Sequence, residues 1–365
     1  MHAPPRTSAQ TTPKLLGLEI VRFLSALAVL VWHYQHFFYV ADAPLSFDRP
    51  SQPFFTTLRL FYEFGNYGVQ LFWCISGFIF FWKYREIIAS RAIGPMKFFA
   101  LRFSRLYPLH LATLLATGAL QSLYLSTHQR PFVYQFNDLR HFILQLGLAG
   151  SWGLERGYSF NGPSWSVSVE VLVYFVFFVT LRHVSRSSLV NLAMVSACLL
   201  LQQYRDYPLV ESLAFFYAGG LSAIAYRHYQ AKGRQRRALT ATVLAVFVLP
   251  AATSMAGVLK SEAMLRHFLV LYVPLLLFLC ATEFTLPPRL QKGIEVAGNM
   301  TYSSYLIHFP LQLLIVYGFG VLDRSVPVHS SIFFLAFFSA TFSLSYVVYR
   351  YFEVPAQRLV RRIIA

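Results

Sequence analysis

The sequence is poor in charged residues. Of its 365 residues, 13% are Asp, Glu, Lys or Arg, whereas 56% are hydrophobic. Soluble domains average about 25% charged residues, and this chain also lacks a hydrophilic stretch long enough to form a separate soluble domain. Its apolar runs repeatedly approach the roughly 20 residues that cross a bilayer. We therefore predict a polytopic membrane protein with one membrane domain.

Acidic residues and cysteines are also scarce. The 15 Asp and Glu residues are outnumbered by 31 Lys and Arg residues, which gives a net charge of +16. In an apolar chain such an excess sets the orientation through basic cytoplasmic loops, so we expect the lipid bilayer, and no nucleic acid, as a partner. The three cysteines, Cys74, Cys198 and Cys280, lie in apolar segments at unrelated spacings. They predict neither a disulfide framework nor a metal site.

Eleven apolar windows are candidates for membrane spans. They cover residues 15–40, 60–82, 99–125, 138–150, 165–181, 188–203, 210–227, 238–258, 266–284, 295–321 and 329–349. The fourth window, DLRHFILQLGLAG, is short and interrupted by glycine, and apolar segments of about 10–14 residues are more often re-entrant or interfacial than spanning. We expect a disordered cytoplasmic tail at 1–14, the membrane domain at 15–355 and a basic cytoplasmic tail at 356–365.

The distribution of basic residues supports this assignment. If the N-terminus is cytoplasmic and the fourth window does not cross, 21 Lys and Arg residues fall in cytoplasmic segments and nine in outer loops. If that window crossed, the strongly basic 227–237 loop would lie outside, against the positive-inside rule. The sequence therefore predicts an all-α integral membrane fold: a bundle of about ten transmembrane helices plus one short re-entrant or interfacial helix. Both termini are predicted to be cytoplasmic, with a long outer loop over 126–164.

The first apolar window carries ionisable side chains. Arg22 and His33 are eleven residues apart, which on an α-helix is three turns plus about 20°, or about 16 Å along the axis. The same side of this helix holds Glu19, Ser25, Ala26, Val29 and His36. Because an Arg at mid-membrane costs about 3 kcal/mol, it normally faces the protein interior and serves a function. This pattern predicts a helix that lines a cavity, with Arg22 near the cytoplasmic face and His33 in the outer half.

Two alternatives remain open for this helix. Arg22 reaches the cytoplasmic surface and pairs with Glu19 there, or His33 is a hydrogen-bonded core histidine without a catalytic task.

Six segments in chain order resemble the acyltransferase 3 family of integral membrane acyltransferases. LEIVRFLSALAVLVWHYQHF (18–37) resembles the first helix of that family, whose pattern is an Arg, ten residues and a His. The other matching residues are Ser76-Gly77-Phe78; Arg102, Arg105, Tyr107 and Pro108; Trp165, Ser166, Ser168 and Glu170; Tyr305 and His308; and Glu353 and Pro355. The chain departs from the family at Glu19, commonly Asp, at Gln70, often Asp, and at Val171, often Glu.

The resemblance implies transfer of an acyl group, usually acetyl from acetyl-CoA, to a hydroxyl of a saccharide in the bacterial inner membrane. His33 is then the catalytic base or a transient acyl carrier, and Glu170 the acid that orients its ring. Arg102 and Arg105 hold the CoA phosphates, and Arg22 guides the donor toward His33. Further site candidates are Glu19, Ser76, Tyr107, Trp165, Ser166, Ser168, Tyr305 and His308, and no metal is expected.

Several competing interpretations stay open at this point. Glu170 fits a helix-start charge, Arg102 and Arg105 fit a positive-inside anchor, and His308 fits a core histidine. A transporter or flippase of a polysaccharide precursor would also line a path with charges, although transporters often show internal repeats and none is found here. A nonenzymatic sensor is a further alternative. The acceptor is expected to be a cell-surface or lipid-linked sugar, such as an exopolysaccharide or lipopolysaccharide, and no oligomeric state is predicted.

Overall fold

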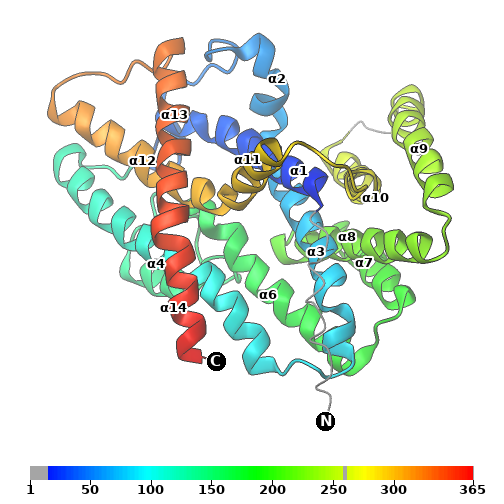
Figure 1. Cartoon of the computed structure of the whole chain (residues 1–365). Coiled ribbons are helices and arrows are strands. Elements are labelled where there is room, and N and C mark those ends of the chain that lie inside the picture. The colour runs from blue at the N-terminus through cyan, green and yellow to red at the C-terminus, as the bar shows by residue number, and fades with distance from the viewer. Residues whose placement is uncertain (1–14, 258–260, 365) are drawn as a thin grey trace.

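A computed structural model describes residues 15–257 and 261–364, and its regular structure is almost entirely helical (Figure 1). The α-helices are α1 (Leu16–Trp32), α2 (Phe55–Phe64), α3 (Gly68–Ala89), α4 (Pro95–His128), α5 (Leu139–Leu146), α6 (Trp165–Val179), α7 (Ser188–Gln202), α8 (Pro208–Ala231), α9 (Gln235–Met255), α10 (Glu262–Cys280), α11 (Pro288–Asn299), α12 (Thr301–Val321), α13 (Ser331–Val348) and α14 (Val354–Ile364). The other elements are η1 (His33–Phe38), β1 (Tyr39–Val40), β2 (Ala43–Pro44), η2 (Gly65–Tyr67), η3 (Gly162–Ser164), η4 (Thr180–Val184) and η5 (Tyr349–Glu353).

Eight helical segments of the described chain are long and apolar enough to cross a membrane. They confirm a helical multi-pass membrane protein. Two of the ten predicted spans are not among these eight segments. Helix α7 has only 15 residues, and α4, with 34 residues, is long enough but lacks a stretch that is both apolar enough and poor in charge. The count of ten and the cytoplasmic position of both termini therefore stay predictions, and the expected disordered tail at 1–14 lies outside the described residues.

The tightest helix packing joins α3 to α8. A Cβ atom on Gly77 would lie 1.8 Å from the Phe216 carbonyl oxygen, and one on Gly219 would lie 2.0 Å from the Cys74 carbonyl oxygen. Such small residues let membrane helices approach closely and gain van der Waals contact. The aromatic core of Phe78, Phe81, Phe177, Phe216 and Tyr217 closes around this crossing, which fixes one wall of the cavity described below.

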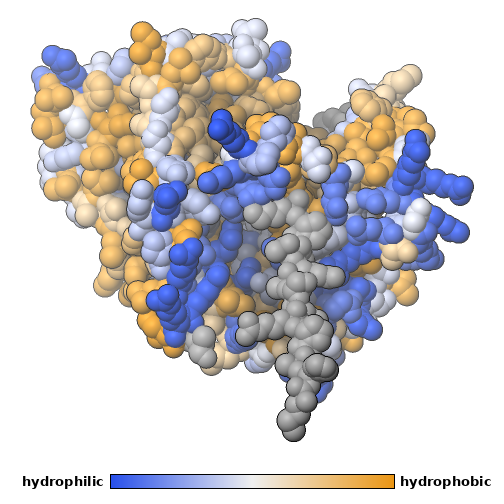
Figure 2. Space-filling model, in the orientation of Figure 1, coloured by the Kyte–Doolittle hydropathy of each residue, from blue (hydrophilic) through white to orange (hydrophobic). Residues whose placement is uncertain are grey.

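Four of the eight helical segments contain a change of helix type, among them the first and the last. The first window leaves the α conformation after Trp32 and continues as the 3₁₀-helix η1. The last helix passes through the π-helical turn η5 into α14, so part of the segment predicted as a basic tail is helical and packs on α4. Figure 2 shows hydrophilic residues gathered over α11 and along α14, whereas hydrophobic residues cover α12 and α13.

The segment predicted as a long outer loop contains only short elements. Residues 138–150 hold α5, a helix of 8 residues, in agreement with a short non-spanning helix. The short antiparallel pair β1–β2 follows η1, and Val40 forms an isolated bridge with Phe132. This bridge ties the start of the loop to the end of the first span.

Candidate functional site

A cavity of about 390 Å³ lies between α1, α3, α4, α6, α12 and α14. Eight of the site residues predicted from the sequence line it: Glu19, Arg22, Ser76, Arg102, Arg105, Ser166, Glu170 and Tyr305. The wall carries five cationic side chains and two carboxylates. The volume is typical of a ligand site, and the excess of positive charge on the wall favours an anionic ligand.

Arg22 and Glu19 form an ion pair on the cavity wall. Arg22 Nη1 donates to Glu19 Oε2 at 2.8 Å, and the two side chains retain 13% and 22% of their exposure. The pairing foreseen by the alternative interpretation is therefore present, and both residues also line the cavity. Helix α11 passes close by, since a Cβ on Gly298 would lie 2.1 Å from the same carboxylate oxygen.

Arg102 and Arg105 lie one turn apart on α4. Arg102 Nη2 donates to the Tyr84 hydroxyl at 2.6 Å, and its guanidinium lies 4.9 Å from the centre of the Phe80 ring. Its Nε is buried without a hydrogen-bond partner. Within the described residues Arg105 makes no hydrogen bond or ion pair. Of the carboxylates near it, Glu353 has the strongest electrostatic interaction with its guanidinium group. Guanidinium groups with free donors at a cavity wall suit a phosphate.

Glu170 is held by two hydroxyl groups. Ser76 Oγ donates to its Oε1 at 2.8 Å, and the Tyr174 hydroxyl donates to the same oxygen at 2.5 Å. Glu170 is the sixth residue of α6, beyond the first turn of the helix, so its interpretation as a helix-start charge is wrong. Within the described residues Glu170 forms no hydrogen bond or ion pair with His33, so the expected pairing of the two is not found.

The ring partner of His33 is His308. His33 Nδ1 lies 3.0 Å from His308 Nε2, and the two rings stack with centroids 4.9 Å apart. His36 also stacks on His33, with centroids 4.5 Å apart, and its ring lies 6.4 Å from that of His308. Gln312 connects the group, because its Nε2 donates to the His33 carbonyl oxygen at 2.9 Å and its Oε1 lies 3.2 Å from His36 Nδ1. His33 retains 6% of its exposure whereas His308 retains none.

Five predicted site residues do not line the cavity: His33, Tyr107, Trp165, Ser168 and His308. Ser168 instead supports the outer loop, since its Oγ accepts from the Ser151 amide at 3.0 Å. Trp165 packs edge-on against Trp73 with centroids 5.7 Å apart, and Tyr107 stacks on Phe103 at 4.4 Å. The cavity and the histidine group meet at α12, where Tyr305 lines the first and His308, three residues later, belongs to the second.

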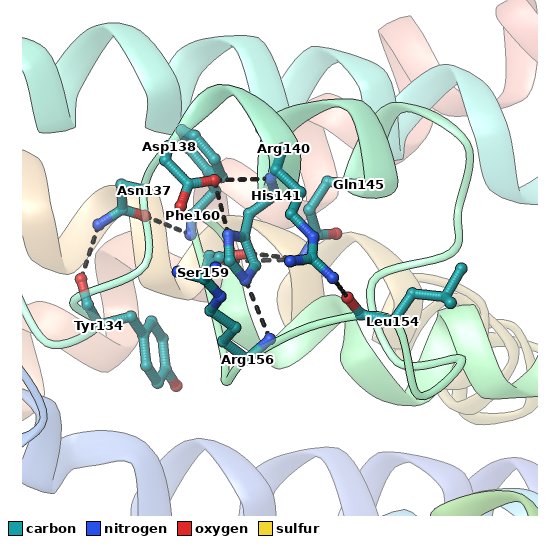
Figure 3. Close-up of polar contacts among 10 residues, drawn as sticks. All are labelled: Tyr134, Asn137, Asp138, Arg140, His141, Gln145, Leu154, Arg156, Ser159 and Phe160. Atoms are coloured by element: carbon teal, nitrogen blue, oxygen red, sulfur yellow. Dashed lines mark hydrogen bonds and ion pairs between the residues drawn. The ribbon is translucent and has the colours of Figure 1, made fainter.

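The outer loop is tied to the histidine group by Tyr134, whose hydroxyl lies 3.2 Å from His36 Nε2. Figure 3 shows the polar contacts that hold the loop itself. Asp138 Oδ1 accepts from the His141 amide at 2.9 Å and lies 2.7 Å from its Nδ1, while His141 Nε2 accepts from the Arg156 amide at 3.1 Å. These hydrogen bonds with His141 lower the pKa of Asp138.

Sequence reasoning missed several cavity residues: Lys83, Tyr84, Tyr174, Tyr302 and Arg361. Tyr174 follows Glu170 by one helical turn, so its position on the same face was visible in the sequence. Lys83 and Arg361 were counted only as cytoplasmic charges, and no local signal distinguishes them from other basic residues. Among the described residues, no group of three or more His, Cys, Asp or Glu side chains is arranged to hold a metal ion.

Comparison with known proteins now adds to this geometry. The family model described as an acyltransferase domain matches residues 15–350. The chain belongs to the acyltransferase 3 family. One curated relative, Acyltransferase MdmB from Streptomyces mycarofaciens, is 30% identical over 176 residues, which are 48% of this chain and 40% of that protein. The match thus spans less than half the length of this relative, and no solved structure matches the chain significantly.

Proposed function

We propose that this acyltransferase 3 member moves an acyl group, most simply acetyl, from cytosolic acyl-CoA to a hydroxyl of a cell-surface or lipid-linked saccharide. The observation that carries the proposal is the buried Arg102 Nε, which lacks a partner in a cavity lined by five cations and two carboxylates. A buried donor without a partner costs about 1–3 kcal/mol, and an anionic ligand removes this cost. Family membership makes acyl transfer the chemistry to which this ligand belongs.

Arg102 and Arg105 are proposed to bind the diphosphate of the donor. Both project from the same face of α4, since residues three apart are neighbours on a helix. Arg102 is held by the Tyr84 hydroxyl and the Phe80 ring, which orients its remaining donors at low entropic cost. The acyl end then points past Arg22 and Glu170 toward Tyr305.

His33 is proposed to act as the base. If its Nδ1–H donates to His308 Nε2, the lone pair of its own Nε2 is free to take the proton of the acceptor hydroxyl. The hydroxyl oxygen then bonds to the thioester carbonyl carbon, the carbon–sulfur bond breaks, and His33 returns the proton to the sulfur. Transient acylation of His33 before transfer to the acceptor is the second route compatible with its position. The acceptor is proposed to bind beneath the outer loop, which reaches this group through Tyr134.

The central test uses purified protein with radiolabelled acetyl-CoA and candidate saccharide acceptors. We expect acyl incorporation and CoA release by the wild type, and a loss of about 10²-fold or more in His33→Ala, because general-base catalysis contributes about that factor. His228→Ala is the matched control, since His228 is exposed near the end of α8 and does not belong to the group of His33, His36 and His308.

Two outcomes would contradict this function. Wild-type acyl transfer by His33→Ala at an equal protein level removes the base assignment. Absence of CoA release by the wild type with every saccharide acceptor favours a transporter instead. Structural analysis of surface glycans with and without the gene then identifies the acceptor.

A further inference from the structure

Two cations stand at the mouth of the cavity and have no role in the proposal above. Lys83 on α3 and Arg361 on α14 both line it, and both are exposed, whereas Arg22, Arg102 and Arg105 are half-buried. Within the described residues Lys83 makes no hydrogen bond or ion pair. The cavity therefore carries one set of cations in its interior and a second set at its opening.

Arg361 is held in place by a series of contacts along α14. Ser303 Oγ donates to the buried Glu353 at 2.5 Å, and Gln357 Nε2 donates to the same carboxylate at 3.1 Å. Arg361 follows Gln357 by four residues, on the same face of the helix, and its Nε donates to Ser104 Oγ on α4 at 3.2 Å. Glu353 thus sets the position from which Arg361 reaches the opening.

The cationic side chains of the cavity wall outnumber the carboxylates near them. Arg22 is neutralised by Glu19. Four cations remain, namely Lys83, Arg102, Arg105 and Arg361, and the carboxylates near them are Glu170 on the wall and Glu353 beside Arg105. A ligand with several negative charges, divided between the interior and the opening, complements this arrangement.

The groups of acyl-CoA follow one another in an order that matches this division between the interior and the opening. Its acyl thioester and pantetheine arm are followed by a diphosphate, and the ribose with its 3′-phosphate comes last. With the thioester innermost and the diphosphate on Arg102 and Arg105, the 3′-phosphate reaches the opening.

We propose that Lys83 and Arg361 bind the 3′-phosphate of the donor and so distinguish CoA from 3′-dephospho-CoA, an inference that rests on the proposed function. Arg361 supplies a planar guanidinium suited to bidentate contact with phosphate oxygens, and Lys83 supplies a point charge. Helix α14 thereby acts as part of the donor site.

The test measures equilibrium binding of CoA and of 3′-dephospho-CoA to the purified full chain by isothermal titration calorimetry. The wild type is expected to prefer CoA. Arg361→Ser and Lys83→Ser are each expected to lose about tenfold in CoA affinity, the equivalent of one charge-assisted contact, with unchanged affinity for 3′-dephospho-CoA. Arg361→Lys should restore part of the preference.

Arg358→Ser is the matched control, because Arg358 is exposed on the same helix but does not line the cavity. Its CoA affinity should equal that of the wild type, and thermal unfolding of all variants checks that they are folded. If the wild type binds CoA but Arg361→Ser and Lys83→Ser keep its preference, the inference is wrong and the proposed function stands. If the wild type binds neither nucleotide, the proposed function itself fails. A loss confined to binding of phosphatidylglycerol vesicles would identify these cations as lipid contacts and overturn the inference.

Discussion

At the scale of single residues, several of the ionisable groups in this apolar chain have specific partners. Arg22 forms an ion pair with Glu19, and a ring nitrogen of His33 lies within hydrogen-bonding distance of one of His308. Charged or polar groups taken out of water require such partners, because the desolvation cost is otherwise uncompensated. The buried Nε of Arg102 lacks such a partner, and the proposed anionic ligand supplies one.

The two hydroxyl groups on Glu170 give a prediction at this scale. Tyr174→Phe removes one donor and Ser76→Ala the other. Because a hydrogen bond to a charged group contributes about 1.5–3 kcal/mol, we expect each variant to lower the rate of acyl transfer by about tenfold or more, and the double variant to lower it further. The rate is measured at saturating acceptor with protein levels matched.

Tyr217→Phe serves as the control for these variants. It also removes a buried tyrosine hydroxyl, which donates to Thr180 Oγ1 at 2.9 Å, but Tyr217 does not line the cavity. An equal loss of activity in Tyr217→Phe and Tyr174→Phe would show that the effect is one of stability, and that Glu170 has no special dependence on Tyr174.

At the scale of elements, the α3–α8 crossing determines where the cavity wall stands. Gly77→Ala places a methyl group 1.8 Å from a backbone oxygen of α8, which no side-chain movement relieves. We expect a clear fall in the thermal unfolding temperature in detergent, since overpacking costs about 1–3 kcal/mol.

Gly293→Ala is the comparison for Gly77→Ala. Gly293 lies within α11 and a Cβ there meets no atom within 4 Å, so the higher helix propensity of Ala should leave stability unchanged or raise it by up to about 1 kcal/mol. Equal unfolding temperatures for Gly77→Ala and the wild type would contradict the close α3–α8 contact.

The hydrogen bonds at the start of α5 predict that the stability of the outer loop depends on pH. The pKa of Asp138 is lowered by its hydrogen bonds with the His141 backbone and side chain, so its folded value lies below the unfolded one. Its contribution to loop stability is then present above pH of about 4 and is lost as pH falls through the folded pKa. Hydrogen exchange of residues 137–160, corrected for the intrinsic rate, should therefore increase on acidification from pH 6 to pH 3.

Two variants check this assignment. Asp138→Asn should show the faster exchange already at pH 6, with little further change at pH 3. Asp323→Asn changes an exposed carboxylate beyond α12 and should behave as the wild type does. Retention of the wild-type pH response by Asp138→Asn would assign the response to another group.

At the scale of the whole molecule, hydrophilic residues gather over α11 and along α14, whereas hydrophobic residues cover α12 and α13 (Figure 2). Lys83 and Arg361 line the cavity where it is exposed. The predicted topology places that opening at the cytoplasm. We expect Arg130→Cys to react with a membrane-impermeant maleimide in intact cells, and Lys232→Cys to react only after lysis, because the 227–237 loop is predicted to be cytoplasmic. Both native residues are exposed, and the unsubstituted protein controls for Cys74, Cys198 and Cys280. The opposite pattern would invert the topology and the side from which the donor enters.

The sequence by itself determined the membrane class and the short α5 helix, through composition and through hydropathy over a window. The family followed from the resemblance of six motifs, and this resemblance also supplied most of the eight predicted site residues that line the cavity. The spacing of Arg22 and His33 predicts a shared side of the first helix, because helical geometry relates neighbouring turns without knowledge of other elements. In the structure Arg22 lines the cavity, whereas His33 lies in η1 within the histidine group.

Only the tertiary structure decided which side chains from different helices contact one another. His33 and His308 are 275 residues apart, and Ser76 and Glu170 are 94 apart, so their contacts follow from how helices pack. Arg361 lines the cavity from α14, and Glu353, just before this helix, accepts a hydrogen bond from Ser303 on α12, 50 residues earlier. Pairing across such separations is a property of the assembled bundle, because it is selected by mutual packing and charge balance that no single segment contains.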